Sequence, residues 1–266
     1  MKLSCHEMML GDRPLAEKFS LARESGFDGL DLRGDLLEDR VAEAARLVRA
    51  TGLPVPTVYG RLQPPLVAKT LTERAESLTV LRSRLRDAER VGAQRVIVVP
   101  IFGAAQITVQ RGRGVEEIEE ALLLTLLDEL ADEARQRQVT IVLEPLNRHQ
   151  THLLTSPRAT AQLTRQLGDA VGTMVDTYHM DVEGQDSAEE IEGAFDQLRL
   201  VHLSDRDRTL PGTGALDFAP GLRKLRSLGY TGWYGFECTG PFTVQQLRES
   251  VQYVRDCLAR SVPIGG

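Results

Sequence analysis

Thr140-Ile141-Val142-Leu143-Glu144 is a short apolar run that ends in an ionisable residue. Three later runs repeat this pattern: Gly172-Thr173-Met174-Val175-Asp176, Leu198-Arg199-Leu200-Val201-His202 and Trp233-Tyr234-Gly235-Phe236-Glu237. Each run has the length and composition of a buried strand, and such a strand has no structural need for an ionisable last residue. The ionisable residues follow one another at roughly 30-residue intervals, which is about one strand–helix unit. The pattern predicts successive βα units whose strands end in functional side chains.

The whole chain alternates short apolar runs with longer helical patterns, which indicates a parallel sheet with crossover helices. We expect eight strands, at residues 2–5, 29–32, 55–59, 95–99, 140–144, 172–176, 198–203 and 233–237. A chain of 266 residues suits one (β/α)₈ TIM barrel, an α/β fold, as a single domain over residues 1–266. A doubly wound open sheet is the structural alternative, because periodicity does not report closure of the sheet.

Helix patterns and caps mark the segments between the strands. The helix expected over residues 116–138 carries Leu123, Leu127 and Leu130 on one broad apolar stripe. Ser156 followed by Pro157 predicts a helix start, and Ser187 with Glu190 three residues later predicts a capping box.

Composition and charge argue against several classes of protein. A formal net charge of −6 argues against a nucleic acid partner, since such proteins present basic surfaces. The three cysteines are an odd number without a CxxC pair, so neither a disulfide framework nor a zinc knuckle is expected. Polar residues appear early in Met1-Lys2-Leu3-Ser4-Cys5-His6-Glu7, and no apolar run approaches the length of a membrane span. We therefore expect a cytoplasmic protein without membrane partners.

The carboxyl ends of barrel strands meet at one mouth, where barrel enzymes keep their active sites. Glu144, Asp176, His202 and Glu237 should therefore converge there. Three carboxylates in a partly desolvated pocket repel one another, and a single divalent cation is an economical way to hold them together. Oxygen-rich ligation with one imidazole favours Mn²⁺, with Mg²⁺, Co²⁺ and Zn²⁺ as alternatives.

Several motifs in the second half of the chain carry a family resemblance. They are Leu143-Glu144-Pro145-Leu146-Asn147-Arg148, Asp176-Thr177-Tyr178-His179, Val201-His202-Leu203-Ser204-Asp205, Gly212-Thr213-Gly214-Ala215-Leu216-Asp217-Phe218 and Gly235-Phe236-Glu237. The chain resembles the xylose isomerase-like barrel superfamily, and within it the sugar isomerase and epimerase branch that includes the D-tagatose 3-epimerase and hydroxypyruvate isomerase groups.

The resemblance implies roles for particular residues. Glu144, Asp176, His202 and Glu237 would be the metal ligands, and Glu144 and Glu237 would also transfer the proton. His179 and Arg208 would contact substrate oxygens, and the chain would form a homodimer or homotetramer. The ketose 3-epimerases carry a second glutamate where this chain has Gln150, which can hydrogen-bond a hydroxyl but cannot act as a base.

Four other residues near the expected mouth each have two possible roles. His6, at the end of the first strand, either packs there or contacts the substrate. Arg61, Arg111 and Arg113 either recognise a phosphate or carboxylate on the substrate or are solvated.

These features together predict a metal-dependent isomerase or epimerase of a small sugar or hydroxy-keto compound. Two glutamates would move a proton through a cis-enediolate whose charge the metal holds. A dehydratase of a cyclic ketone, of the inosose or dehydroshikimate type, is the main alternative. An abasic-site endonuclease would need more histidines than the five present. A non-catalytic sugar-binding barrel would have no need for three mutually repelling carboxylates.

Overall fold

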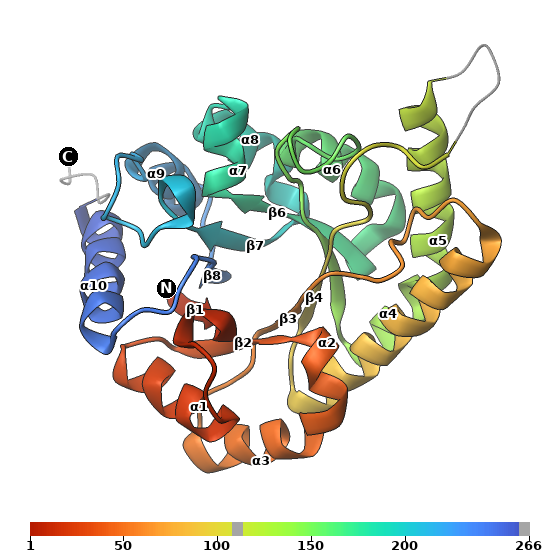
Figure 1. The fold of residues 1–266 in the computed structure, drawn as a ribbon. Coiled ribbons are helices and arrows are strands. Elements are labelled where there is room, and N and C mark those ends of the chain that lie inside the picture. Colours follow the sequence, from red (N-terminus) through yellow and green to blue (C-terminus); the bar gives the residue numbers. More distant parts are fainter. Residues whose placement is uncertain (108–113, 261–266) are drawn as a thin grey trace.

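Eight parallel strands form a closed barrel in the computed structural model, which describes residues 1–107 and 114–260 (Figure 1). The strands are β1 (Lys2–His6), β2 (Gly29–Arg33), β3 (Thr57–Tyr59), β4 (Arg95–Val98), β5 (Thr140–Leu143), β6 (Val171–Asp176), β7 (Leu198–Leu203) and β8 (Trp233–Phe236). Strand β1 pairs with β8, with Lys2 opposite Trp233, and this pairing closes the sheet. The expected (β/α)₈ barrel is confirmed, and the open-sheet alternative is wrong.

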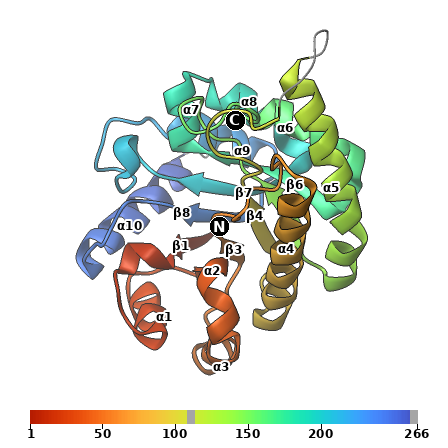
Figure 2. The same cartoon turned by 45° about the vertical axis from the view of Figure 1, so that its right-hand side comes forward.

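Helices surround the barrel, as the turned view in Figure 2 also shows. They are α1 (Leu15–Glu24), α2 (Gly34–Leu37), α3 (Val41–Thr51), α4 (Leu71–Val91), α5 (Val115–Arg137), α6 (Pro157–Thr164), α7 (Thr177–Glu183), α8 (Ser187–Ala194), α9 (Ala219–Ser227) and α10 (Val244–Arg260). No helix in the described ranges has the length and apolar character that a membrane span requires.

Strand boundaries agree with the sequence pattern to within two residues. The largest difference is at β3, which begins at Thr57 rather than at Val55. Pro56 explains this late start, because proline has no N–H to donate to the strand ladder.

Helix caps were predicted less accurately. Ser156 caps α6 as expected and accepts a hydrogen bond from the backbone N–H of Ala159. The capping box at Ser187 is wrong, since the N-cap of α8 is Asp186, one residue earlier. Aspartate is as good an N-cap as serine, and the Asp186 side chain accepts hydrogen bonds from the backbone N–H groups of Ala188 and Glu189. Glu190 instead accepts hydrogen bonds from Ser156 and Arg158 of α6.

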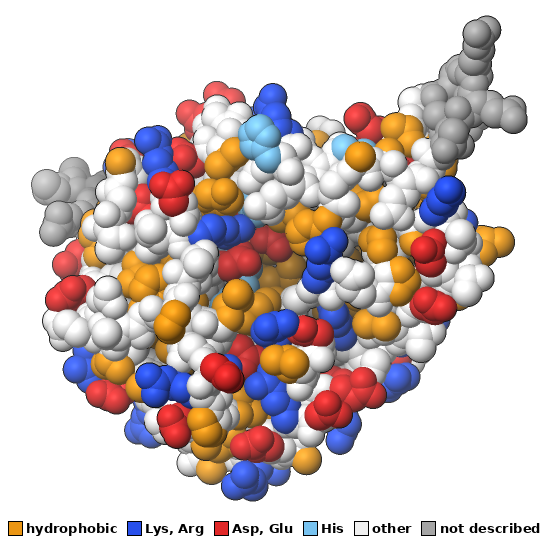
Figure 3. All heavy atoms as spheres, viewed as in Figure 1, with side chains coloured by type: hydrophobic (Ala, Val, Ile, Leu, Met, Phe, Trp, Pro, Cys, Tyr) orange, Lys and Arg blue, Asp and Glu red, His pale blue; other side chains and the backbone are white. Residues whose placement is uncertain are grey.

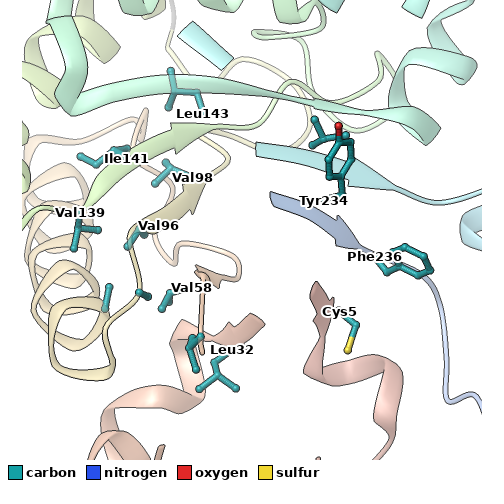
Figure 4. Close-up of a cluster of buried hydrophobic side chains, with 14 of the residues drawn as sticks. Cys5, Leu32, Val58, Val96, Val98, Val139, Ile141, Leu143, Tyr234 and Phe236 are labelled. Atoms are coloured by element: carbon teal, nitrogen blue, oxygen red, sulfur yellow. The ribbon is translucent and has the colours of Figure 1, made fainter. Parts of the chain in front are cut away.

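The core has two parts, separated by the strands. A large cluster fills the space between the strands and the helices, and it includes the strand residues labelled in Figure 4. A small cluster lies among alternate strand positions: Tyr59, Ile97, Val142, Met174, Leu200 and Trp233. Because strand side chains alternate between faces, the small cluster identifies the positions that point into the barrel.

Helix α5 shows how an amphipathic stripe anchors the outer layer. Leu127 and Leu130 are fully buried, whereas Thr125 on the opposite side is exposed. We expect Leu127→Ala to lower the free energy of unfolding by about 2–5 kcal/mol, because it removes buried apolar contacts and leaves a cavity. Thr125→Ala is the matched control and should change it by less than about 0.5 kcal/mol. Urea denaturation measures both, and equal effects would contradict the placement of the stripe.

Candidate metal centre

The four strand-end residues converge because each continues the inward-pointing positions of its strand. Glu144, Asp176 and His202 each lie two residues after a member of the inner cluster, and Glu237 lies four after Trp233. With a side-chain period of two, all four point inward at the carboxyl ends of their strands. One ligand atom from each of these residues lies within 4.8 Å of the others. We call Glu144, Asp176, His202 and Glu237 the acidic cluster, and this end of the barrel the mouth.

His202 lies at the centre of the acidic cluster. Its Nδ1 atom is 3.0 Å from Glu237 Oε2 and 3.7 Å from both Glu144 Oε1 and Asp176 Oδ2. His202 and Asp176 are almost completely buried, and the Glu237 side chain is 27% exposed. The cluster is therefore open to the mouth on the side of Glu237. In Figure 3, acidic and basic side chains meet in a hollow near the middle of the face.

The electrostatics of the acidic cluster reflect crowded negative charge. Burial, and then the charge of Glu237, raise the pKa of Glu144. Burial also opposes ionisation of Asp176, but Arg208 and His179 outweigh it and lower the pKa of Asp176 to about 2. Burial disfavours the charged imidazole of His202, yet the three surrounding carboxylates raise its pKa well above the ordinary value. The three carboxylates thus depend on positive charge at this point.

Arg208 supplies positive charge directly to the cluster. Its Nη1 atom donates hydrogen bonds to Asp176 Oδ2 at 2.7 Å and to Glu237 Oε2 at 2.9 Å. Its guanidinium also lies 4.5 Å from the ring centroid of Tyr178. Arg208 and its neighbour Asp207 both have a φ near +58°, a strained conformation for residues other than glycine. Backbone strain of this kind persists where the surrounding structure holds it in place.

Asp205 holds the loop that carries Arg208. The Asp205 carboxylate is fully buried and accepts hydrogen bonds from four backbone N–H groups, those of Arg206, Gly212, Gly214 and Leu216. A Cβ atom at Gly214 would lie 2.3 Å from Asp205 Oδ1, so a larger residue would displace this carboxylate. These bonds hold the loop in an ordered conformation.

His179 and His6 flank the acidic cluster. His179 Nδ1 accepts a hydrogen bond from the backbone N–H of Asn147, and His179 Nε2 lies 2.7 Å from Arg208 Nη2. His6 stacks on Tyr59 at 3.7 Å between ring centroids, and its Nδ1 is 3.9 Å from Glu237 Oε1. Burial lowers the pKa of His6 to about 3, so its ring is neutral near pH 7.

The structure does not bring every predicted site residue to the cluster. Gln150 has an exposed side chain without a hydrogen bond to any described residue. The Arg61 guanidinium lies 4.7 Å from the Phe102 ring centroid and has no ion pair among the described residues. Arg111 and Arg113 lie outside the described residues.

The donor set fits a divalent cation. Three carboxylates offer hard oxygen ligands, and one imidazole nitrogen points to the same spot. Glu144 Oε1 is buried without a hydrogen-bond partner among the described residues, as expected for an oxygen whose partner would be a cation. The residues that would hold the ion are those of the acidic cluster.

A closed β/α barrel with such a donor set at its mouth defines a class, the barrel proteins built to hold a cation beside a small ligand. The family model described as xylose isomerase-like TIM barrel matches residues 19–257. The chain therefore belongs to the xylose isomerase-like TIM barrel family, which confirms the resemblance drawn from the motifs.

The chain is similar to known epimerases over most of its length. It is 27% identical to 3-dehydro-D-guloside 4-epimerase of Escherichia coli strain K12, across 97% of this chain and 100% of that protein. It is 26% identical to D-psicose 3-epimerase of Enterocloster bolteae, across 83% of this chain and 74% of that protein. A crystal structure of E. coli 3-keto-D-glucoside 4-epimerase has a TM-score of 0.84 at 26% identity, with 97% and 100% of the chains covered.

His152 and Glu119 form an ionic contact beside the mouth that sequence reasoning missed. His152 Nδ1 lies 2.9 Å from the Gly103 carbonyl, and its Nε2 contacts the buried Glu119 carboxylate. Both partners are acceptors, so a charged imidazole donates to both. Burial opposes that charge, but the bonds to Gly103 and Glu119 outweigh it and raise the pKa of His152. The contact joins the loop after β5 to the loop after β4 and to α5.

This contact predicts a pH-dependent stability. A pKa raised by folding stabilises the protein fully below the unfolded value of about 6.5, and the effect is lost as the pH rises through the folded pKa. The free energy of unfolding of the wild type should therefore exceed that of His152→Gln by the largest amount below about pH 6.5. This gap should close at alkaline pH. Denaturation curves across pH measure the gap, and Glu119→Gln should reduce its pH dependence, with the bond to the Gly103 carbonyl retaining part of it. A gap of constant size would contradict the charged contact.

Proposed function

We propose that this chain is a divalent-metal-dependent epimerase or isomerase of a keto sugar, with Glu144 and Glu237 as the proton-transferring residues. The observation that carries the proposal is the convergence of two glutamates, an aspartate and a histidine within 4.8 Å at the barrel mouth. The names of the relatives, which are sugar epimerases, support the same reaction class. A cytoplasmic location and a dimer or tetramer stay predictions.

The positions of the two glutamates favour a two-sided proton transfer. Glu144 follows β5 and Glu237 follows β8, so strands β6 and β7 separate them on one side of the closed barrel. A substrate carbon held between them is approached by the two carboxylates from different sides. Removal of the proton by one carboxylate and its return by the other inverts that carbon, which is an epimerisation.

The remaining chemistry divides between the cation and the chain. A bound divalent cation would supply positive charge where negative charge develops on the substrate oxygens as the proton leaves. Asp176 and His202 would hold the cation without taking part in proton transfer. Arg208 donates to the carboxylates of Asp176 and Glu237, and His179 Nε2 lies beside the Arg208 guanidinium, so both would be placed to orient substrate hydroxyl groups. His6 and Tyr59 present a flat neutral surface next to Glu237.

Keto glycosides are the substrates to test first. The relative that matches this chain over its full length is named for epimerisation of a dehydroguloside at carbon 4. The glutamate that the ketose 3-epimerases carry is Gln150 here, with an exposed side chain that lacks a base. Both facts favour a keto glycoside over a free ketose.

A substrate screen in D₂O tests the proposed reaction. The Mn²⁺-loaded protein is incubated with 3-keto glycosides, D-psicose, a sugar phosphate, hydroxypyruvate and an inosose, and followed by NMR. We expect inversion next to the carbonyl of a keto glycoside, with solvent deuterium at the inverted carbon. Removal of the metal by a chelator should abolish turnover and leave the circular dichroism spectrum unchanged, because the apolar core does not include the cluster. Elimination of water, or turnover without metal, would overturn the proposal.

Glu237→Gln separates proton transfer from metal binding. The amide retains an oxygen near the cation but removes the base, so turnover should fall by roughly 10²-fold or more while the metal remains bound. The variant should still exchange the substrate proton with D₂O on the face served by Glu144, without inverting the centre. Metal content and exchange are measured on the same sample. Retained inversion would rule out Glu237 as a proton-transferring residue, and loss of exchange in a metal-loaded variant would rule out the two-sided mechanism.

A further inference from the structure

Asp31 is a buried carboxylate that the proposed reaction does not use. It belongs to β2, points into the barrel and has no exposed surface. Ser4 Oγ donates a hydrogen bond to Asp31 Oδ2 at 2.6 Å, while Asp31 Oδ1 has no hydrogen-bond partner among the described residues. A buried carboxylate with an unsatisfied oxygen costs stability, so it calls for a partner.

His202 has an unsatisfied atom in the same interior. Its Nδ1 faces the three carboxylates of the acidic cluster, at 3.0 to 3.7 Å. Its other ring nitrogen, Nε2, is buried and has no hydrogen-bond partner among the described residues. A histidine that offers one nitrogen to a cation carries its proton on the other, and that N–H needs an acceptor.

Gly235 leaves the space in which these two groups approach each other. In register, Gly235 stands opposite Ser4 on one side and opposite His202 on the other. A Cβ atom at Gly235 would lie 3.3 Å from Asp31 Oδ2 and 3.4 Å from His202 Nε2. Asp31 Oδ2, which also accepts from Ser4, and His202 Nε2 thus flank one point that any side chain at residue 235 would fill.

We propose that Asp31 is the positioning residue for His202. The two groups share no direct hydrogen bond, so one water molecule that accepts the Nε2–H of His202 and donates to the Asp31 carboxylate would join them. This contact fixes the ring orientation and the tautomer that leaves Nδ1 free for the cation. Ser4 holds the carboxylate in place, and Gly235 keeps the path open. The inference rests on the proposed cation site and extends it to a residue outside the ligand set.

A structural role for Asp31 is the competing explanation. Arg95 also points into the barrel, and its Nη1 atom lacks a hydrogen-bond partner among the described residues. If Asp31 served to balance the charge of Arg95, its neutralisation would destabilise the metal-free protein. If Asp31 serves His202, neutralisation instead removes a costly buried charge from the metal-free protein and weakens the cation site.

Asp31→Asn distinguishes these roles, since the amide is the same size and is a weaker acceptor. The full-length chain is treated with chelator and titrated with Mn²⁺ by calorimetry. We expect the dissociation constant to rise about 10- to 100-fold, with no fall in the melting temperature of the metal-free variant. Asp28→Asn is the matched control, because Asp28 accepts the backbone N–H of Leu3 and faces Arg255 on the outside. It should lower the melting temperature and leave Mn²⁺ affinity unchanged.

NMR of the His202 ring measures the Nε2 proton directly, and its chemical shift would not change if Asp31 had only a structural role. In ¹⁵N-histidine-labelled protein, the Nε2 proton of His202 should resonate downfield and exchange slowly with water, both without metal and with Mg²⁺. Asp31→Asn should shift this resonance upfield, whereas Asp28→Asn should not. If Asp31→Asn does not fold, the wild-type spectrum decides, because exchange as fast as that of the exposed His149 excludes the contact.

The outcomes separate this inference from the proposed function. Unchanged Mn²⁺ affinity in folded Asp31→Asn, an equal loss in Asp28→Asn, or an unshifted Nε2 proton would each overturn the role of Asp31. A wild-type chain that binds no divalent cation would overturn the cation site, and the Nε2 proton in the metal-free chain would still show whether Asp31 contacts His202.

Discussion

Three carboxylates gathered within a few ångströms at the mouth of the barrel are the constraint on which the site depends. Burial, and then the charge of Glu237, raise the pKa of Glu144, whereas Arg208 keeps the pKa values of Asp176 and Glu237 low. Such a cluster persists only where positive charge compensates it. In this chain Arg208 and His202 provide that charge, and a divalent cation would provide more of it at the same point. The arginine and the cation would therefore compete for Asp176 and Glu237.

The loop that carries Arg208 is built to tolerate this competition. Its backbone is strained at Asp207 and Arg208, yet the buried Asp205 fixes the loop through four backbone N–H groups. The base of the loop is thus held independently of the guanidinium. Displacement of the guanidinium from the carboxylates would break none of the Asp205 bonds, because none of them involves Arg208.

The sequence predicts the parts of the site that depend on strand periodicity. Glu144, Asp176, His202 and Glu237 were found because each ends an apolar run, and alternation within a strand places such residues at the mouth. Asp31 was not predicted, because it lies inside its apolar run, where Gly29-Leu30-Asp31-Leu32 has the pattern of a strand with one polar position.

The contact between His152 and Glu119 joins a loop to a helix, and the position of a loop is set by tertiary packing that no local sequence pattern records. The substrate contact expected of Gln150 rests on family spacing alone and stays a prediction, because its exposed side chain makes no hydrogen bond to a described residue.

The barrel interior is asymmetric, and this asymmetry links stability to the site. Strands β5 to β8 contribute the apolar residues Val142, Met174, Leu200 and Trp233 below the acidic cluster. Strands β3 and β4 add Tyr59 and Ile97 to these apolar residues. Strands β1 to β4 also contribute polar groups at inward positions, namely Ser4, Asp31, Thr57 and Arg95, and one side-chain atom each of Asp31, Thr57 and Arg95 lacks a hydrogen-bond partner among the described residues. Barrel interiors are usually filled by branched apolar side chains, and each unsatisfied polar group there costs stability. These polar positions include Asp31, which we propose to be the acceptor for the one histidine of the acidic cluster. The inward polar groups of β1 to β4 thus cost stability, and they lie beside the charged groups of the acidic cluster.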